Sequence, residues 1–395
     1  MVPKEWTLET LGSITAESAF GPRFSSDLYD DNGTVGTIRT TDLDEEGNIN
    51  YSTIPYAYLP KSFESHYLRE HDLLITRSGS CGIPCLFENQ TKPIIAGAFL
   101  IRFRLNNKAE PRFIHALLKS EKLQNKIQSM TAGGVQKNLS GTNLKKLEFF
   151  LPPLSEQKKI AQILSTWDKA ITTTEKLLAN SEQQKKALMQ QLLTGKKRFL
   201  SFCDEWKQIR LKSVLKEEKA RNRDNSIQQV LSITNHSGFV LPEEQFSKRI
   251  ASDNISNYKI VRNGQFGYNP SRLNVGSFAR LDKLNIGVLS PMYIVFSVKS
   301  DSLDSDYFLC WMQSNEAKQR VSNNTQGSVR DSVGFDALCR LPFKLPPMIE
   351  QKKIASMIAV ANQEIEKIKQ KLVYFRQEKK ALMQQLLTGK RRVKL

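Results

Sequence analysis

The sequence is poor in the residues from which many enzyme and metal sites are built. It has four histidines and five cysteines in 395 residues. The cysteines are odd in number and irregularly spaced, which favours reduced thiols over a disulfide framework. They are Cys81, Cys85, Cys203, Cys310 and Cys339. The sequence therefore offers few candidate residues for catalysis that depends on histidine.

Long hydrophobic runs are also missing. No apolar run reaches the roughly 18–20 residues that would span a bilayer. The amino-terminal segment MVPKEWTLETLGS lacks the basic and then apolar pattern of a secretion signal. We therefore expect the protein to stay in the cytoplasm.

Enzyme motifs are incomplete where they occur. Residues 193–197 include a Gly-Lys pair, but they lack the earlier glycine and the Ser or Thr of a phosphate-binding loop. Tyr268-Asn269-Pro270-Ser271 comes nearest to the Asn/Asp-Pro-Pro-aromatic box of amino-methyltransferases, and its second proline is missing. No catalytic residue is predicted, and a cryptic catalytic site remains the alternative.

One short stretch holds four residues of the kinds that bind zinc: His66, His71, Cys81 and Cys85. Zinc ribbons and fingers normally pair their ligands in tight knuckles, and neither pair here has that spacing. The favoured interpretation is that these side chains are buried or half-exposed on strands. No metal ligand is predicted, with zinc kept as the alternative.

Acidic residues are outnumbered by basic ones. There are 40 Asp and Glu against 58 Lys and Arg, which gives a net charge of +18. Such a surplus favours a polyanionic partner, most often nucleic acid. A basic enzyme, a protein of a membrane surface, or a charge that only aids solubility are the alternatives. The length exceeds one ordinary domain of roughly 100–200 residues, so two or more cores are expected.

An internal repeat organises the chain. Residues 152–161 (PPLSEQKKIA) return 194 positions later as residues 346–355 (PPMIEQKKIA), and residues 185–196 are identical to residues 379–390. Weaker matches lie outside these segments, for example Trp6 with Trp206. The chain therefore consists of a globular region, a helix, a second globular region and a second helix, with globular regions that differ more than the helices.

Two long helices are predicted from the repeated segments. Prolines followed by Glu-Gln suit a helix start, and Gly195 and Gly389 before basic residues suit helix ends. Between them, alternating steps of four and three mark a coiled-coil seam. The seam positions are Ile160, Leu164, Trp167, Ile171, Thr174, Leu178, Ser181, Lys185, Leu188 and Leu192, then Ile354, Ile358, Ala361, Ile365, Ile368, Leu372, Phe375, Lys379, Leu382 and Leu386. Because the seams match step for step, we expect antiparallel pairing that separates the globular regions, rather than packing of each helix on its own region.

The globular regions are mixed, with a bias towards strands. Residues 72–77, 99–103 and 292–296 are strand-like, whereas residues 112–127 and 306–321 are helical. The predicted fold class is therefore α+β, with two mixed α/β domains and two long helices. The expected boundaries are 1–150, 151–198, 199–345 and 346–395.

The doubled helix motif, ending in Leu-Leu-Thr-Gly-Lys, resembles the specificity subunits of type I restriction–modification systems. Residues 71–79 (HDLLITRSG) are similar to that family's Gly-Asp-Leu-Leu-x-x-Arg-Ser-Gly box, with His71 in place of glycine, and residues 268–276 carry a related version. The resemblance covers essentially the whole chain. It implies a target-recognition domain in each half, pseudo-twofold symmetry, and a bipartite DNA target read in two parts.

The resemblance also implies partners. In such systems two methyltransferase subunits dock on the conserved helices, and restriction (helicase-nuclease) subunits join them for cleavage. S-adenosylmethionine, ATP and Mg²⁺ would belong to these partners, so that this chain would be a non-catalytic DNA-binding subunit. A self-sufficient DNA-modifying enzyme and a coiled-coil scaffold are the alternatives.

Matching to the family's loop boxes selects candidate DNA contacts, since phosphate contacts position a protein and base-edge contacts specify the sequence. In the first half they are Arg77, Ser78, Ser80, Gln136, Lys137 and Asn138. In the second half they are Asn269, Ser271, Arg272, Asn274 and Arg330. Polar loops after early strands add Arg39, Thr40, Asn235 and His236. A solvated or turn-forming role is the alternative for each of them.

Overall fold

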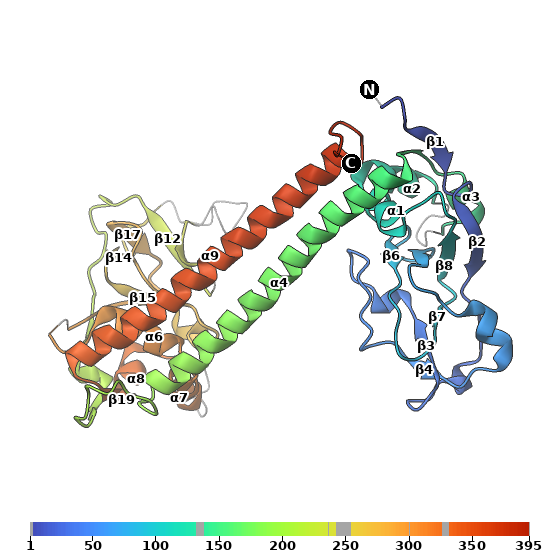
Figure 1. Ribbon diagram of the computed structural model, residues 1–395. Helices are drawn as coiled ribbons and strands as arrows, with labels where there is room; N and C mark the ends of the chain where they lie inside the picture. Colours follow the sequence, from blue (N-terminus) through green and yellow to red (C-terminus); the bar gives the residue numbers. More distant parts are fainter. Residues whose placement is uncertain are drawn as a thin grey trace. The chain divides into compact units, whose positions relative to one another are not determined.

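The computed structural model describes residues 3–131, 138–235, 237–241, 254–299, 301–325 and 332–394. The chain divides into two compact units. Unit 1 comprises Met1–Glu175 and Gln370–Leu395, and unit 2 comprises Lys176–Lys369. Each unit contains one globular head and a part of each of two long helices, α4 (Leu154–Leu192) and α9 (Met348–Leu386), drawn in green and red in Figure 1.

Head 1, in unit 1, begins at β1 and ends at β9. Its strands are β1 (Thr7–Thr10), β2 (Thr15–Phe20), β3 (Val35–Ile38), β4 (Tyr56–Ala57), β5 (Leu73–Thr76), β6 (Pro84–Leu86), β7 (Ile94–Ala96), β8 (Leu100–Leu105) and β9 (Glu148–Leu151). Its helices are α1 (Pro111–Leu118), α2 (Glu121–Ser129) and α3 (Gly141–Lys145), with short 3-10 turns η1 (Ser26–Leu28), η2 (Thr40–Asp42) and η3 (Lys61–His66).

Head 2, in unit 2, begins at β10 and ends at β19. Its strands are β10 (Lys207–Arg210), β11 (Leu215–Glu217), β12 (Val230–Thr234), β13 (Gly238–Val240), β14 (Lys259–Arg262), β15 (Phe266–Tyr268), β16 (Phe278–Arg280), β17 (Ile286–Leu289), β18 (Ile294–Val298) and β19 (Pro342–Leu345). Its helices are α6 (Ser305–Gln313), α7 (Asn315–Thr325) and α8 (Phe335–Arg340), with 3-10 turns η4 (Leu211–Ser213) and η5 (Pro270–Arg272).

The two heads share the strand order of their main sheet, whereas the second sheet has the order β4-β3-β7 in head 1 and β13-β12-β17-β14 in head 2. A four-stranded antiparallel sheet has the order β2-β8-β5-β6 in head 1 and β11-β18-β15-β16 in head 2. A second sheet contains one parallel pair in each head, β3 with β7 and β12 with β17. The first and last strands pair as β1 with β9 and as β10 with β19. The internal repeat therefore extends from the helices to the main sheet of both heads.

The predicted strands and helices are confirmed, with one refinement to the helices. The strand-like runs correspond to β5, β8 and β18. Each helical patch is two short helices, because Ser120 and Ser314 adopt extended backbone between them. The Ser314 hydroxyl accepts a hydrogen bond from the amide of Ala317 at 3.2 Å, which suits a residue that precedes a helix.

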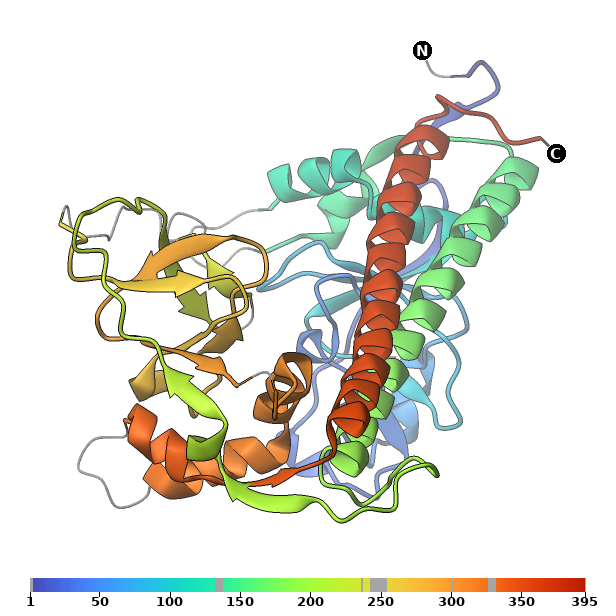
Figure 2. The same cartoon turned by 90° about the vertical axis from the view of Figure 1, so that its left-hand side faces the viewer.

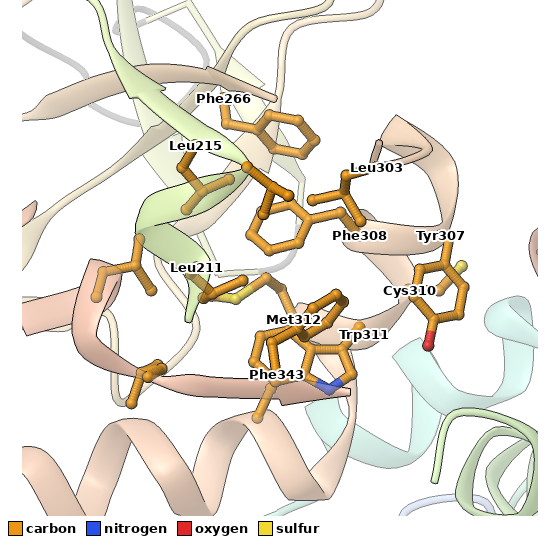
Figure 3. Packing of buried hydrophobic residues seen from close by; sticks show 14 of the residues in the cluster. Leu211, Leu215, Phe266, Leu303, Tyr307, Phe308, Cys310, Trp311, Met312 and Phe343 are labelled. Carbon is orange, nitrogen blue, oxygen red and sulfur yellow. The ribbon is translucent and has the colours of Figure 1, made fainter. Parts of the chain in front are cut away.

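The core of unit 2 is rich in aromatic side chains (Figure 3). Trp311 of α6 meets Phe343 of β19 edge to face, with ring centroids 4.8 Å apart. Leu192 and Leu193, at the end of α4, belong to the same buried cluster, as does Ile354 near the start of α9. Head 2 is therefore packed against the end of one long helix and the start of the other.

Unit 1 repeats this arrangement with the two helices exchanged. Its buried cluster contains Ile160 and Leu164 from the start of α4, and Leu386 and Leu387 from the end of α9. The alternative in which a helix packs only on the head that precedes it is therefore not observed. Each head holds the start of its own following helix and the end of the other helix.

The two long helices pair antiparallel, as predicted (Figure 2). In unit 1, Trp167 meets Phe375 edge to face at 5.6 Å between centroids, and Asp168 forms an ion pair with Lys379. In unit 2, Glu182 lies 3.7 Å from Lys369. Also in unit 1, Glu175 forms an ion pair with Arg376 at 2.7 Å, so the ion-pair partner on α9 moves from Lys379 to Arg376 as the residue on α4 moves from Asp168 to Glu175, which defines antiparallel pairing. Every seam position is buried or half-buried, so the 4-3 pattern is confirmed.

The repeated Glu-Gln pair at each helix start ties the unit together. Glu156 accepts hydrogen bonds from Arg392, at 2.7 and 2.9 Å, and from the Trp6 indole at 3.2 Å. Glu350 accepts the equivalent bonds from Arg198, at 2.9 and 2.8 Å, and from the Trp206 indole at 2.9 Å. The hydrogen bonds to these carboxylates raise the pKa of both arginines.

The neighbouring glutamines satisfy the backbone ahead of α1 and α6. Gln157 accepts from the amide of Glu110 at 2.8 Å and donates to the carbonyl of Lys108 at 3.0 Å. Gln351 accepts from the amide of Asp304 at 2.8 Å and donates to the carbonyl of Ser302 at 3.1 Å. All four Glu and Gln side chains are buried, so the strict repetition of Glu-Gln has a structural cause.

Both helices end as predicted, at glycines in the left-handed region. Gly195 has φ of 70° and Gly389 has φ of 71°. A side chain at Gly389 would lie 2.6 Å from Pro3 Cδ, whereas one at Gly195 would lie 3.4 Å from the Trp206 ring. The turn after each helix therefore needs glycine for its backbone conformation.

Within the described ranges, no helix is long and apolar enough to cross a membrane.

Candidate nucleic-acid interface

In head 1, three of the predicted contact residues lie together at one end of the four-stranded sheet. Arg77 and Ser78 directly follow β5. Ser78 forms an isolated β-bridge with Asn138, and the amide of Leu139 donates to the carbonyl of Arg77 at 2.9 Å. The sheet end and the segment that begins at Asn138 are thus joined through backbone bonds.

The Arg77 side chain is held against an aromatic ring. Its guanidinium carbon lies 4.5 Å from the centroid of Phe20, the last residue of β2. The Arg77 amide donates to the carbonyl of Phe99 at 2.9 Å. A guanidinium above an aromatic face is oriented by a cation–π contact while its N–H groups remain able to donate.

The rest of the box forms a compact loop. The Thr76 hydroxyl donates to the carbonyl of Ser80 at 2.5 Å, and the amide of Gly82 donates to the carbonyl of Thr76 at 2.8 Å. The Cys81 thiol donates to the carbonyl of Arg77 at 3.1 Å. Ser80 is exposed at the tip of this loop. The internal bonds fix the loop, and its outer side chains face solvent.

Head 2 places its own box at the equivalent position, after β15. Asn269 is the residue before η5, and its side-chain oxygen accepts from the amide of Ser271 at 3.1 Å. Arg272 and Asn274 are exposed. The amide of Val333 donates to the carbonyl of Pro270 at 2.9 Å, which repeats the bond from Leu139 to Arg77.

Asn235 joins this second group. A Cβ built on Gly276, at the end of the box loop, would lie 4.0 Å from the Asn235 Cβ. The Ser277 hydroxyl also donates to the carbonyl of Ile233 in β12, at 3.2 Å. The loop after β12 and the box after β15 therefore share one surface of head 2.

Arg39, a predicted contact outside the two boxes, uses its guanidinium for hydrogen bonds within the protein. Its guanidinium donates to Asp42 at 3.0 and 2.8 Å and to the carbonyl of Thr53 at 3.0 Å. The hydrogen bond with Asp42 raises the pKa of Arg39. Thr40 begins η2 beside it. Three of the guanidinium's contacts are thus with its own loop, which favours a structural role for this arginine.

Four predicted contact residues lie outside the described ranges: Gln136, Lys137, His236 and Arg330.

Cys85 is one of the four residues considered as possible zinc ligands. The Cys85 thiol is buried in β6 and donates to the carbonyl of Leu74 at 3.6 Å. Burial raises the pKa of Cys85 to about 12, so its thiol stays protonated. In the parts of the chain that the structure describes, no three His, Cys, Asp or Glu side chains are grouped to hold a metal ion.

Sequence reasoning missed two residues beside the first box, Phe20 and Phe99. Both are large apolar side chains that are about half exposed, at 47% and 53%. Neither belongs to a polar motif, whereas the predicted contacts were all polar or charged residues on loops. A glycine close to each phenylalanine at a strand end, Gly21 and Gly97, was the available signal.

Two heads with the same main sheet, each with an exposed polar box at the same end of that sheet, define a duplicated recognition protein. Residues 3–183 and residues 204–373 each match the model of one protein family, the Type I restriction modification DNA specificity domain. The chain therefore belongs to this family and carries two copies of its domain.

Relatives in two organisms are named specificity subunits of type I restriction enzymes. The chain is 24% identical over 388 residues to the Type I restriction enzyme MjaVIII specificity subunit of Methanocaldococcus jannaschii, covering 89% of this chain and 88% of that protein. It is 29% identical over 157 residues to the Type I restriction enzyme EcoKI specificity subunit of Escherichia coli, covering 37% of this chain and 33% of that protein.

Solved structures share the fold. The S subunit of a type I restriction-modification system from M. genitalium superposes with a TM-score of 0.60 at 15% identity, covering 98% of this chain and 96% of that one. The HsdS subunit from Thermoanaerobacter tengcongensis gives a TM-score of 0.53 at 17% identity, covering 98% of both chains.

Proposed function

We propose that each head reads one part of a split DNA sequence, and that the chain directs type I methyltransferase and restriction subunits to that sequence. The observation that carries this proposal is the pair of boxes. Both follow the same strand of the same sheet and are tied to the chain by the same backbone bond, yet they present different side chains. Boxes that have the same backbone position but different exposed side chains suit the recognition of two different half-sites.

The charge of the chain supports DNA as the ligand. A net charge of +18 attracts the phosphate backbone without regard to sequence, and the exposed donors of the boxes can then discriminate between bases. Arg77 in head 1 and Arg272 in head 2 are of the type that makes bidentate contacts to guanine. Ser78, Asn138, Asn269 and Asn274 can act as donors or acceptors beside them.

We propose that the chemistry belongs to the partners, which would bind S-adenosylmethionine, ATP and Mg²⁺. The relatives are named specificity subunits, which supports a role in recognition. The one box with a likeness to an amino-methyltransferase motif has its tyrosine, Tyr268, fully buried in the sheet. Its asparagine, Asn269, accepts a hydrogen bond within its own turn.

Methylome sequencing tests the recognition role. Cells that express the chain together with its methyltransferase should show one methylated motif made of two specific parts separated by a spacer of fixed length. Cells with the methyltransferase alone should lack it. An unchanged methylome in the presence of both proteins, or a motif with a single continuous part, would contradict the proposal.

A transfer assay tests the division of labour. The purified chain, incubated with duplex DNA and radiolabelled S-adenosylmethionine, should transfer no label, and addition of the methyltransferase should restore transfer. Label transferred by the chain alone, in amounts that track the chain through chromatography, would instead support a self-sufficient modifying enzyme.

A further inference from the structure

An exposed apolar feature lies beside the first box. We call Phe20, Arg77 and Phe99 the aromatic rim. Phe20 is the last residue of β2, Phe99 directly precedes β8, and Arg77 directly follows β5. These three strands are neighbours in the sheet, so the three residues lie at the same end of it. Each phenylalanine exposes about half of its area, which is unfavourable in water unless a ligand covers it.

The backbone under the aromatic rim is tightly packed. A Cβ at Gly21 would lie 2.0 Å from the carbonyl oxygen of Gly97, so these two segments are in direct backbone contact. The amide of Gly21 donates to the carbonyl of Leu100 at 3.1 Å, and the amide of Arg77 donates to that of Phe99 at 2.9 Å. The rings are thus carried on a frame fixed before any ligand binds.

Head 2 repeats the feature with a different residue. Ile101 pairs with Ile75 in head 1, and Ile294 pairs with Tyr268 in head 2. The residue two positions before each isoleucine is Phe99 in one head and Met292 in the other. Met292 is 61% exposed. An exposed large apolar side chain therefore occupies the same place beside both boxes.

DNA is the ligand that these surroundings favour. The Phe20 ring lies 4.5 Å from the Arg77 guanidinium carbon, the Phe99 carbonyl accepts from the Arg77 amide, and both phenylalanines belong to a strongly basic chain. A stable protein interface buries about 800 Å² on each side, which two phenylalanines cannot supply. Apolar side chains do contact the thymine methyl group in the major groove, or insert at base steps in the minor groove.

We propose that Phe99, supported by Phe20, makes an apolar contact with the bases of one half-site, and that Met292 does the same in the other half-site. The inference rests on the proposed function and adds readers that are neither charged nor hydrogen-bonding. Arg77, stacked on Phe20, orients the DNA so that the Phe99 ring meets base edges rather than phosphates.

The test uses the full chain assembled with its methyltransferase. The probes are a duplex that carries the motif found by methylome sequencing and duplexes in which one half-site or both are scrambled. The variants are Phe99→Ala, Phe99→Leu and Met292→Ala. Tyr58→Ala is the matched control, because Tyr58 is an exposed aromatic of head 1 (51%) that follows β4, in the other sheet. Thermal unfolding confirms that each variant is folded.

We expect Phe99→Ala to weaken binding to the full motif about 5- to 150-fold, the range for one lost base contact. Binding to the doubly scrambled duplex should stay the same, and so should the slope of log affinity against log salt, because no phosphate contact is lost. Phe99→Leu should keep most of the affinity. Phe99→Ala should reduce the preference for one half-site over its scrambled version, and Met292→Ala should reduce the preference for the other half-site.

Three results would overturn the inference: unchanged affinity in Phe99→Ala, an equal loss in Tyr58→Ala, or an equal loss on specific and scrambled DNA. Failure of the proposed function is a separate outcome, because the unaltered complex would then not distinguish the motif from scrambled DNA. A selective unaltered complex with an indifferent Phe99→Ala variant would leave the function intact and remove the aromatic rim from it.

Discussion

Glu156, in the first turn of α4, accepts two hydrogen bonds from Arg392, a residue 236 positions further along the chain and beyond the end of α9. Glu350 and Arg198 repeat this relationship in unit 2. The two ion pairs differ in exposure, since 42% of the Arg392 side chain is accessible against 22% of Arg198. Matched substitutions at the two glutamates therefore make an informative pair.

Glu350→Gln should destabilise unit 2 by about 1.5–3 kcal/mol, the usual value of a buried hydrogen bond to a charged group. Glu156→Gln should have the smaller effect, because Arg392 is better hydrated once its partner is lost. Denaturant unfolding followed by tryptophan fluorescence measures both, since Trp6 and Trp206 donate to these carboxylates. A larger loss in Glu156→Gln would contradict the ranking by exposure.

The helix-ending glycines provide a second matched pair. Gly195→Ala should cost about 1 kcal/mol from its left-handed backbone alone. Gly389→Ala should cost clearly more, because its new methyl group would meet Pro3 Cδ at 2.6 Å and something must move. Urea midpoints of the two variants test this order. Equal midpoints would show that the segment around Pro3 can move away from the new methyl group without loss of stability.

Acid should destabilise head 1 through His115. Burial lowers the pKa of His115 in α1 to about 4, whereas the unfolded chain titrates near 6.5. The unfolded state then takes up the proton first, so this stabilisation is complete above pH 6.5 and is lost as the pH falls towards 4. The loss should reach about 1–3 kcal/mol. In His115→Gln, stability should depend less on pH between 6.5 and 4, and an unchanged dependence would assign the acid sensitivity elsewhere.

The two boxes should act on separate half-sites. Changing Arg77 and Ser78 to alanine should alter one part of the methylated motif, and changing Arg272 and Asn274 should alter the other. A lost base contact should cost about 1–3 kcal/mol at one position, whereas a lost phosphate contact weakens binding to every sequence. Methylomes of both double variants provide the measurement. Equal changes in both parts from either variant would refute the two-reader proposal.

Two copies of one methyltransferase subunit should bind each chain. The identical residues 185–196 and 379–390 place Lys185 and Thr194 beside a groove in unit 2, and Lys379 and Thr388 beside a groove in unit 1. The same surface is therefore offered twice. Native mass measurement of the purified complex tests the stoichiometry. A stable complex that holds one methyltransferase at saturating concentration would count against this argument.

Local patterns in the sequence predicted the elements whose cause is local. The 4-3 seam specifies the pairing of α4 with α9, and the glycines specify where these helices end, because each signal lies within a few residues. The strand at β5 was predicted for the same reason: four consecutive apolar or β-branched residues, all of them buried.

Relationships between distant segments could not be predicted in this way. The parallel pairing of β3 with β7 joins Gly36 to Ile94, which are 58 positions apart in the sequence (94 − 36). Arg39 was selected as a donor on a loop, but its engagement with Asp42 depends on the backbone of η2. Phe20 and Phe99 come together at Arg77 only because β2, β8 and β5 are neighbours in one sheet.

The division into units has a consequence for synthesis on the ribosome. Unit 2 is one continuous stretch, Lys176–Lys369, so all of its residues are translated before Leu386, Leu387 and Arg392. Head 1 of unit 1 is translated before unit 2, yet unit 1 lacks Leu386, Leu387 and Arg392 until translation has passed unit 2. The head that is made first is thus the one completed last, and until then its surface for the end of α9 stays open to other apolar segments.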